Sequence, residues 1–507
     1  KRAQLLNSFE FDKSSSVLEV GCGCGAISRY LGETFDEVIS IEGTFARAKL
    51  AKERTKDLET VNIVNAPFQD LDFIKKFDLI ICVGVFEYSS AFISGQDPHD
   101  EALSYFSSLL KPNGTLIIAI ENQFGLKYYS SGKEDHTNIM FDGIEGYPRY
   151  PNMARTFGKK EVTDRILNYF DNINFYYPYP DYKIPSLILS DEAFSKGSFG
   201  ELISNFHSPR KNNYFKEPLF DETLALLEIE QNAQLNFFAN SFLIIANKSL
   251  DSKINFPHLG VFYSGNRKPE YQTKTTIDSS AEGIVVNKKF LNKTIKRENN
   301  KTKLKLKECS SLWIHSDTLE LSLYKRCRNT ELILAKFFEP CLIWVNYLND
   351  ISIKSNKEGY IDGKYIDFIW KNTIIDGQVC SFIDNEWVYE DRISINALAI
   401  RSVYYFLCRV RNLPDLSKNL RSYSLEKQII KITKILGLSV TKNDFKEFYV
   451  IEKVMNNNFN LRDRLYIKHT LVIEILSNLK MYTNSLLKDS INFISRIASF
   501  VSRKINS

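Results

Sequence analysis

The chain has 507 residues, of which 44% are hydrophobic, so it can build the cores of two or three domains and is not a disordered chain. A net charge of +5 is too small to indicate a dominant field for nucleic acid. The eight cysteines are scattered, and the nearest pair, Cys22 and Cys24, supports neither a disulfide framework nor a zinc site. Because the sequence has no signal peptide and no apolar run of roughly 20 residues, we expect a cytoplasmic protein.

A strand followed by a glycine-rich turn opens the chain. Residues 17–20 are apolar except for Glu19, and Gly21, Gly23 and Gly25 follow at alternate positions. Glycines in this pattern let a strand turn sharply into a helix and let a ligand lie against bare backbone. The turn therefore predicts a nucleotide-binding loop.

Four further strands are predicted, with helical stretches between them, at residues 37–41, 61–64, 78–83 and 115–120. Glu42 ends the second strand, seventeen residues after Gly25, where an acid can accept both hydroxyls of a ribose. The alternation predicts an α/β, doubly wound, Rossmann-like sheet with its ligand at the carboxyl ends of the strands. The loops at those ends contain the other predicted cofactor contacts, which are Ala66, Phe68, Val83 and Gly84.

Together these features resemble class I S-adenosylmethionine-dependent methyltransferases. Glu19 to Gly25 resemble the first motif of that family, Glu42 its ribose-binding acid, and Lys111 to Gly114 the turn before its fifth strand. The resemblance covers about residues 1–250 and implies a methyltransferase domain with S-adenosylmethionine as cofactor. A nicotinamide-binding domain is the alternative, although Glu19 and the Lys111–Gly114 turn would be unusual there.

The segment after the fifth strand, about residues 121–183, is interpreted as an acceptor lid because it concentrates acids, aromatic residues and glycines. His136 is the candidate general base for a hydroxyl acceptor, with Glu134, Asp135 or Asp142 orienting it. Aromatic faces with polar rims suit a saccharide. The alternative is that these polar side chains only stabilise a long loop.

The second half contains a second candidate site. Residues 254–291 predict the strands of a new sheet, and residues 367–384 place an Asp, an Asn and a second Asp around a hairpin. This pattern resembles the catalytic and metal-binding segments of protein-kinase-like and aminoglycoside-phosphotransferase-like enzymes. The resemblance implies binding of ATP and Mg2+, with Asp367 as the base, Asn372 and Asp384 as metal ligands, and Lys288 or Lys289 on the nucleotide. No clear glycine-rich phosphate loop precedes Lys288, so a degenerate kinase-like module is the alternative.

The predicted domains are a methyltransferase domain at residues 1–250, an α+β kinase-like domain at 251–420 and a helical region at 421–507. Their combination resembles the bifunctional methyltransferase-kinases that terminate bacterial O-antigen polysaccharides, which implies a saccharide acceptor. A terminal amphipathic helix, from Leu487 to Ile505, would bind the inner-membrane surface or glycan-assembly proteins.

Two other functions are alternatives to this prediction. One is an idle scaffold that binds cofactor without turnover. The other is a methyltransferase for a small metabolite or for nucleic acid. Nucleic acid is disfavoured because residues 84–87 do not form a base-flipping loop and the first 250 residues contain no basic stripe.

Overall fold

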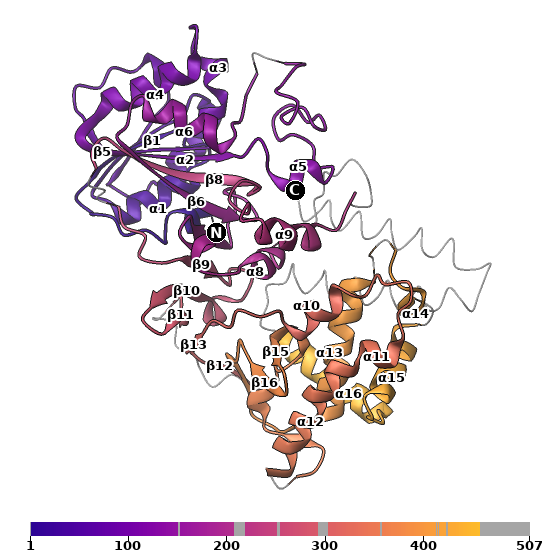
Figure 1. Ribbon diagram of the computed structural model, residues 1–507. Coiled ribbons are helices and arrows are strands. Elements are labelled where there is room, and N and C mark those ends of the chain that lie inside the picture. The colour runs from indigo at the N-terminus through magenta and orange to yellow at the C-terminus, as the bar shows by residue number, and fades with distance from the viewer. Residues whose placement is uncertain are drawn as a thin grey trace, which may run out of the picture. The chain divides into compact units, whose positions relative to one another are not determined.

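The computed structural model describes residues 2–150, 153–206, 219–250, 254–292, 303–354, 357–411, 413, 415–421 and 424–456. These residues form two compact units (Figure 1). The first unit contains the chain up to Gly265, together with Gln272–Lys293 and Glu308–Asp317, and the remaining described residues form the second.

A twelve-stranded sheet is the centre of the first unit. Its strand order is β13-β11-β10-β9-β7-β6-β8-β5-β4-β1-β2-β3. The strands from β5 to β3 in this order are parallel, whereas β8 and the strands beyond it are antiparallel to their neighbours. The strands are β1 (Ser16–Val20), β2 (Glu37–Ile41), β3 (Val61–Val64), β4 (Phe77–Val83), β5 (Leu110–Glu121), β6 (Asn172–Tyr179), β7 (Leu187–Ser190), β8 (Ser241–Asn247), β9 (Gly260–Tyr263), β10 (Thr273–Ser280), β11 (Gly283–Phe290) and β13 (Cys309–Leu312).

Helices cover both faces of the parallel strands, which confirms the predicted doubly wound sheet. Figure 1 shows α4 and α6 on one side of these strands and α1 on the other. Each face has its own apolar core, with Phe106 and Ile166 in one and Ile27 and Leu31 in the other. The helices of this unit are α1 (Ala26–Thr34), α2 (Phe45–Arg54), α3 (Ser89–Phe92), α4 (Pro98–Leu109), α5 (Leu126–Tyr129), α6 (Lys159–Leu167), α7 (Ala193–Lys196), α8 (Gly200–Ser204) and α9 (Glu222–Gln231).

The predicted turn at Lys111–Gly114 lies inside β5 as an irregularity of its pairing with β4. Phe77 pairs with Leu110, but Leu79 pairs with Thr115, so the turn residues are displaced from the register. Beyond the turn, the pairing is regular up to Ala119. The strand therefore delivers Glu121 to the carboxyl end of the sheet.

The expectation of a new sheet after residue 254 is wrong. Strands β9, β10, β11 and β13 extend the first sheet, because β9 pairs with β7 through Leu187 and Phe262. Lys288 and Lys289 lie on β11 and so belong to the first unit. The first unit thus continues past the predicted domain end at residue 250.

The second unit consists of short strand pairs and helices. Three two-stranded antiparallel sheets pair β12 (Leu304–Leu306) with β17 (Trp387–Tyr389), β14 (Tyr360–Ile361) with β18 (Ile393–Ser394), and β15 (Thr373–Asp376) with β16 (Val379–Phe382), of which only the last is a hairpin among the described residues. The helices are α10 (Leu319–Tyr324), α11 (Leu334–Phe337), α12 (Glu339–Lys354), α13 (Ile395–Val410), α14 (Lys418–Arg421), α15 (Leu425–Ile435) and α16 (Lys442–Asn456). Among the described residues, no helix combines the length and the apolar character needed to cross a bilayer. The predicted amphipathic helix from Leu487 to Ile505 lies outside the described residues.

Candidate functional site

The glycine loop joins β1 to α1, and its three glycines all have positive φ. A Cβ on Gly21 would lie 2.3 Å from Cγ2 of Val85, and one on Gly25 would lie 2.8 Å from Cα of Ala51. A Cβ on Gly23 would meet no atom within 4 Å. Gly21 and Gly25 are therefore required by close packing, whereas Gly23 borders open space in which a ligand can lie against the backbone.

Glu42 ties the loop to the end of β2. Its Oε2 accepts a hydrogen bond from the Gly23 amide at 2.8 Å, and its Oε1 accepts one from the Thr44 amide at 2.9 Å. A carboxylate has about four acceptor positions, so both oxygens can still accept ribose hydroxyls. The open space at Gly23 and the carboxylate of Glu42 together fit a nucleoside cofactor.

Glu19, on β1, links two neighbouring elements beneath the glycine loop. Its Oε2 accepts hydrogen bonds from the hydroxyls of Ser28 and Ser40, at 2.6 and 2.7 Å. Burial raises the pKa of Glu19 to about 6 although these two bonds act in the opposite direction. The side chain therefore connects α1 to β2.

The other predicted cofactor contacts lie in different surroundings. Ala66 is partly buried in the loop after β3, and Val83 ends β4. Phe68 packs in the core, with its ring 5.6 Å from that of Phe106. Gly84 has positive φ, and a Cβ there would lie 2.7 Å from the hydroxyl of Tyr182. Tyr182 therefore covers the loop after β4.

Next to Tyr182 lies a buried group that we call the acid–histidine cluster: Glu87, Glu121 and His136. One potential ligand atom from each residue lies within 4.8 Å of the others. Nε2 of His136 is 3.5 Å from Oε2 of Glu121, and the hydroxyl of Tyr182 is 3.3 Å from both oxygens of Glu121. Glu87 and Glu121 are 1% and 0% exposed, and the His136 side chain is 5% exposed. The cluster thus borders the loop after β4, from which Glu87 itself comes.

Three different elements supply this cluster. Glu87 lies in the short 3-10 helix after β4, Glu121 is the last residue of β5, and His136 comes from the predicted lid. Because the carboxyl ends of parallel strands meet at one edge of a sheet, residues distant in sequence converge there. Neither glutamate is among the residues that the sequence predicts to be catalytic, although Glu87 follows β4 and Glu121 ends β5, at the edge of the sheet where the sequence predicts the ligand.

Charges within the cluster act strongly on each other. Burial, followed by the Glu121 carboxylate, raises the pKa of Glu87. Burial opposes ionisation of Glu121 too, yet its pKa is lowered because His136 and Lys183 stabilise the carboxylate. Nζ of Lys183 is 2.6 Å from Oε1 of Glu121. Glu121 also raises the pKa of His136 against the effect of burial. Glu121 is therefore the ionised acid, and Glu87 the one that retains a proton more readily.

Of the three carboxylates expected to orient His136, Asp135 and Asp142 pair with other side chains, whereas Glu134 contacts the His136 backbone. Asp142 forms an ion pair with Arg149 at 2.8 Å, and Asp135 contacts Lys127, Lys183 and the hydroxyl of Tyr128. Glu134 accepts a hydrogen bond from the backbone amide of His136 at 2.7 Å and so positions only its backbone. The carboxylates of Glu121 and Glu87 lie near the imidazole in the cluster, and the hydroxyl of Tyr88 is 3.0 Å from Nδ1.

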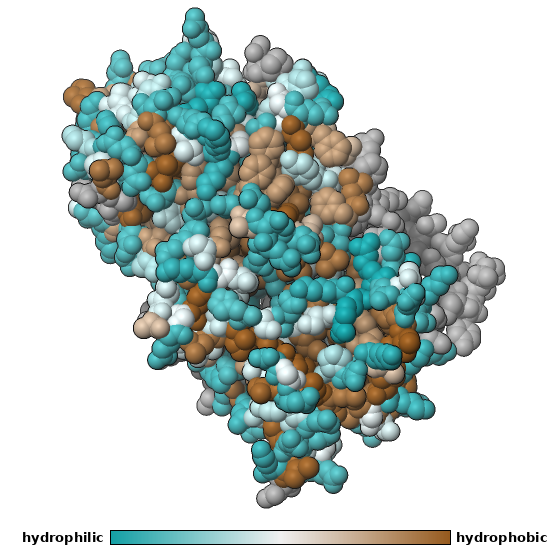
Figure 2. Space-filling model, viewed as in Figure 1, coloured by the Kyte–Doolittle hydropathy of each residue, from teal (hydrophilic) through white to brown (hydrophobic). Residues whose placement is uncertain are grey.

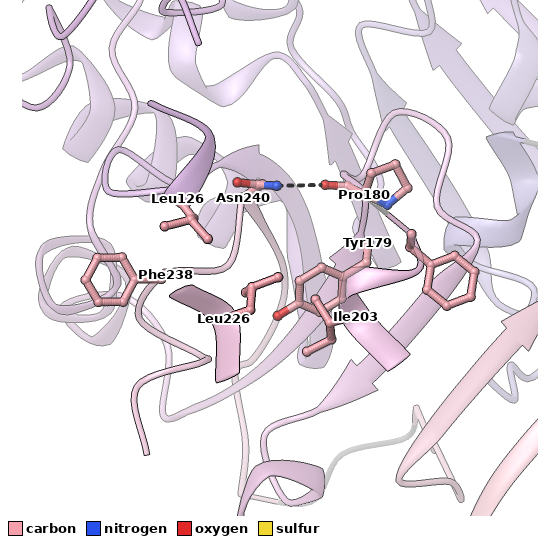
Figure 3. Close-up of a pocket in the computed structure, with 8 residues that line it drawn as sticks. Leu126, Tyr179, Pro180, Ile203, Leu226, Phe238 and Asn240 are labelled. Atoms are coloured by element: carbon pink, nitrogen blue, oxygen red, sulfur yellow. Dashed lines mark hydrogen bonds between the residues drawn. The ribbon is translucent and has the colours of Figure 1, made fainter. Parts of the chain in front are cut away.

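The segment that carries Tyr182 and Lys183 starts beside a small apolar pocket (Figure 3). Asn240 donates a hydrogen bond to the carbonyl oxygen of Pro180 at 3.3 Å, and its Oδ1 accepts one from the Lys127 amide. These bonds join the start of α5 to the segment after β6. Figure 2 shows hydrophilic side chains over much of this face of the first unit, with more apolar ones gathered near α5.

In the second candidate site, two of the predicted residues, Asp367 and Asn372, are in contact. Asn372 donates a hydrogen bond from Nδ2 to the backbone oxygen of Asp367 at 2.9 Å, and Asp384 follows β16 with positive φ. Nη1 of Arg401, which is 2% exposed, lies 3.1 Å from Oδ1 of Asp367. The predicted base is therefore already paired with a buried guanidinium.

Comparisons with known proteins agree with the fold of the first unit. Residues 18–118 match the model of a family described as a methyltransferase domain. The chain is 27% identical over 119 residues to the cyclopropane-fatty-acyl-phospholipid synthase of Escherichia coli K12, a match that covers 23% of this chain and 29% of the synthase. It is also 27% identical over 170 residues to an uncharacterized methyltransferase of Alkaliphilus oremlandii, which covers 32% of this chain and 71% of that protein.

A similar solved structure is that of the N-methyltransferase NodS from Bradyrhizobium japonicum WM9, with 13% identity and a TM-score of 0.28. The match covers 48% of this chain and 93% of NodS. From the family match and the loop geometry, the N-terminal part of the chain contains a class I S-adenosylmethionine-dependent methyltransferase domain.

Proposed function

We propose that the first unit transfers the methyl group of S-adenosylmethionine to an acceptor that reaches the acid–histidine cluster. The observation that carries this proposal is the position of Tyr182, whose hydroxyl lies over Gly84 and 3.3 Å from Glu121. The loop after β4 therefore borders the polar cluster through Tyr182 and also through Glu87, which lies in the 3-10 helix after β4. Methyl transfer depends chiefly on in-line positioning of the acceptor, so a cluster at this place is suited to hold it.

The acceptor group that suits the cluster best is a hydroxyl. A hydroxyl must lose its proton on methylation, and buried carboxylates and an imidazole are groups that take or stabilise protons. The surroundings also suit a saccharide, because Tyr88 is 37% exposed and offers an aromatic ring, and the half-exposed Lys183 offers a hydrogen-bond donor.

Kinase-like phosphoryl transfer by the second unit is the second candidate function. The hydrogen bond from Asn372 to the Asp367 backbone supports it, whereas the pairing of Asp367 with Arg401 favours a degenerate module. A methyltransferase joined to such a unit supports a role in surface-polysaccharide biosynthesis. Calorimetric titration with ATP and Mg2+, compared between the wild-type chain and Asp384→Asn, tests this candidate.

The first test of methyl transfer is calorimetric titration of the full chain with S-adenosylhomocysteine, followed by assays with labelled S-adenosylmethionine and a panel of saccharides and small hydroxylated metabolites. His136→Ala should lower turnover by at least about 100-fold and leave cofactor affinity unchanged, because the cluster faces the acceptor. Glu145→Gln, which removes an exposed carboxylate of the same segment, is the matched control. Absence of cofactor binding would overturn the proposal, and binding without turnover of any acceptor would favour a scaffold.

A further inference from the structure

The acid–histidine cluster contains polar atoms that the protein itself does not satisfy. Oε2 of Glu87 and Nε2 of His136 are fully buried and, among the described residues, have no hydrogen-bond partner. Oε2 of Glu121 lies 3.5 Å from the same Nε2 and accepts a hydrogen bond from the hydroxyl of Tyr182 at 3.3 Å. A buried polar atom without a partner costs about 1–3 kcal/mol, so two such atoms beside a buried carboxylate indicate that something binds between them.

We infer that Glu87, Glu121 and His136 bind a divalent metal ion. Two carboxylates and one imidazole are a ligand set that suits ions such as Mn2+, Fe2+ and Zn2+. At metal–ligand distances of about 2.0–2.2 Å, two ligands of one ion are at most about 4.4 Å apart, so the three ligand atoms, which lie within 4.8 Å of one another, would move closer together on binding. Three protein ligands leave coordination positions open for an acceptor oxygen.

Charge also favours a cation. The side chains that act electrostatically on the cluster include the carboxylates of Glu134 and Asp135 and the ammonium groups of Lys127 and Lys183. With Glu87 and Glu121 both ionised as ligands, the group has two more carboxylates than ammonium groups, because metal binding displaces the proton that Glu87 otherwise retains more readily. A divalent cation would balance this excess in a site where unpaired charge is costly.

The surroundings of the three ligands resemble the outer shell of a metal site. Nδ1 of His136 contacts the hydroxyl of Tyr88 at 3.0 Å, which fixes the ring and leaves Nε2 directed at the cluster. Nζ of Lys183 contacts Oε1 of Glu121 at 2.6 Å, and Oε2 of the same carboxylate faces His136. The ammonium group thus occupies one oxygen of Glu121 without closing the space between the ligands.

This inference deepens the proposed function and rests on it for the acceptor that would share the metal ion. A metal ion lowers the pKa of a bound hydroxyl and so makes it more reactive without a strong base. His136 would then be a ligand through Nε2, in place of the general base that the sequence predicts. The competing explanation is a proton on Glu87, which would satisfy its carboxyl group without any metal.

The test is direct metal binding to the full-length chain. The chain is stripped with EDTA, and then Mn2+ is titrated by electron paramagnetic resonance of the free ion and Zn2+ by calorimetry. We expect one saturable site. Glu87→Gln and His136→Ala should each weaken binding more than about 100-fold, and Tyr88→Phe by about tenfold, since outer-shell changes typically cost 10- to 100-fold. Glu145→Gln should bind as the wild type does.

Each outcome separates this inference from the proposed function. Absence of saturable binding of both ions to the wild-type chain would overturn the inference, as would undiminished binding by Glu87→Gln and His136→Ala. S-adenosylhomocysteine titrated into the same samples shows whether each variant is folded and whether the cofactor site exists. Cofactor binding without metal binding would leave the proposed function standing, and metal binding without cofactor binding would leave only the metal site.

Discussion

At the scale of single residues, Gly23 differs from the other two glycines of the cofactor loop because it borders open space. We expect Gly23→Ala to weaken binding of S-adenosylhomocysteine by at least tenfold, since the methyl group would enter the space left for the ligand and the φ of +55° would cost about 1–2 kcal/mol. Calorimetry measures the affinity. Gly437→Ala is the control, because Gly437 also has positive φ and open space but lies in the second unit. Equal affinities for the two variants would show that Gly23 does not border the cofactor.

Glu19 makes the stability of the first unit depend on pH. Burial raises its pKa from 4.5 to about 6, so the folded chain binds more protons than the unfolded chain between these values. The stabilisation is complete below pH 4.5 and is lost as the pH rises through 6. The shift corresponds to about 2 kcal/mol.

The variant Glu19→Gln removes this titration. Relative to the variant, the wild type should lose about 2 kcal/mol of unfolding free energy between pH 4 and pH 7. Chemical denaturation of both proteins at several pH values measures the difference. A difference that stays constant with pH would show that Glu19 titrates alike in the folded and unfolded chain.

At the scale of secondary-structure elements, Gly25, which precedes α1, packs closely against α2. A Cβ there would lie 2.8 Å from Cα of Ala51, which is backbone and cannot rotate away. Gly25→Ala should therefore lower the melting temperature by several degrees, corresponding to about 2–3 kcal/mol, through strain and separation of the helices. Scanning calorimetry distinguishes it from Gly23→Ala, which should affect the ligand more than stability. A Gly25→Ala protein as stable as the wild type would contradict the close packing.

The parallel strands could be predicted because local pattern determines them. Apolar runs and the glycine turn place β1 to β4 within one residue of their observed bounds, whereas β5 begins at Leu110, five residues before its predicted start. The continuation of the sheet through β9, β10, β11 and β13 could not be predicted, since an antiparallel strand at the end of one domain and at the start of another has the same alternating pattern. The pairing of Leu187 with Phe262 shows that these strands continue the first sheet and do not start a second one.

The site was predicted in part for a similar reason. Gly23 and Glu42 are close in the chain to the strands that position them, so the motif predicts their meeting. The partners of His136 are not local: Glu121 ends a strand and Tyr88 follows another. Asp135 and Asp142 are nearer to His136 in sequence, but Asp135 forms an ion pair with Lys127 and Asp142 forms one with Arg149. Choosing between nearby and distant carboxylates requires the three-dimensional arrangement.

At the scale of the whole molecule, the two units are interleaved along the chain. Residues 266–271 and 294–307 belong to the second unit, whereas Gln272–Lys293 and Glu308–Asp317 return to the first. A cut at the predicted domain end, residue 250, would therefore remove four strands from the first sheet. It would also remove buried side chains of its core, among them Leu259, Ile277 and Ile284.

A fragment of residues 1–250 should consequently aggregate, whereas one of residues 1–317 should be monomeric and bind S-adenosylhomocysteine as the full chain does. Without β9, the strand β7 becomes an edge whose backbone groups are unpaired, and Ile188 and Leu189, which are 0% exposed in the full chain, lose their cover. Size-exclusion chromatography and cofactor titration of both fragments measure the difference. A monomeric 1–250 fragment with full cofactor affinity would show that the antiparallel extension is dispensable, and that the methyltransferase domain ends where its sequence pattern does.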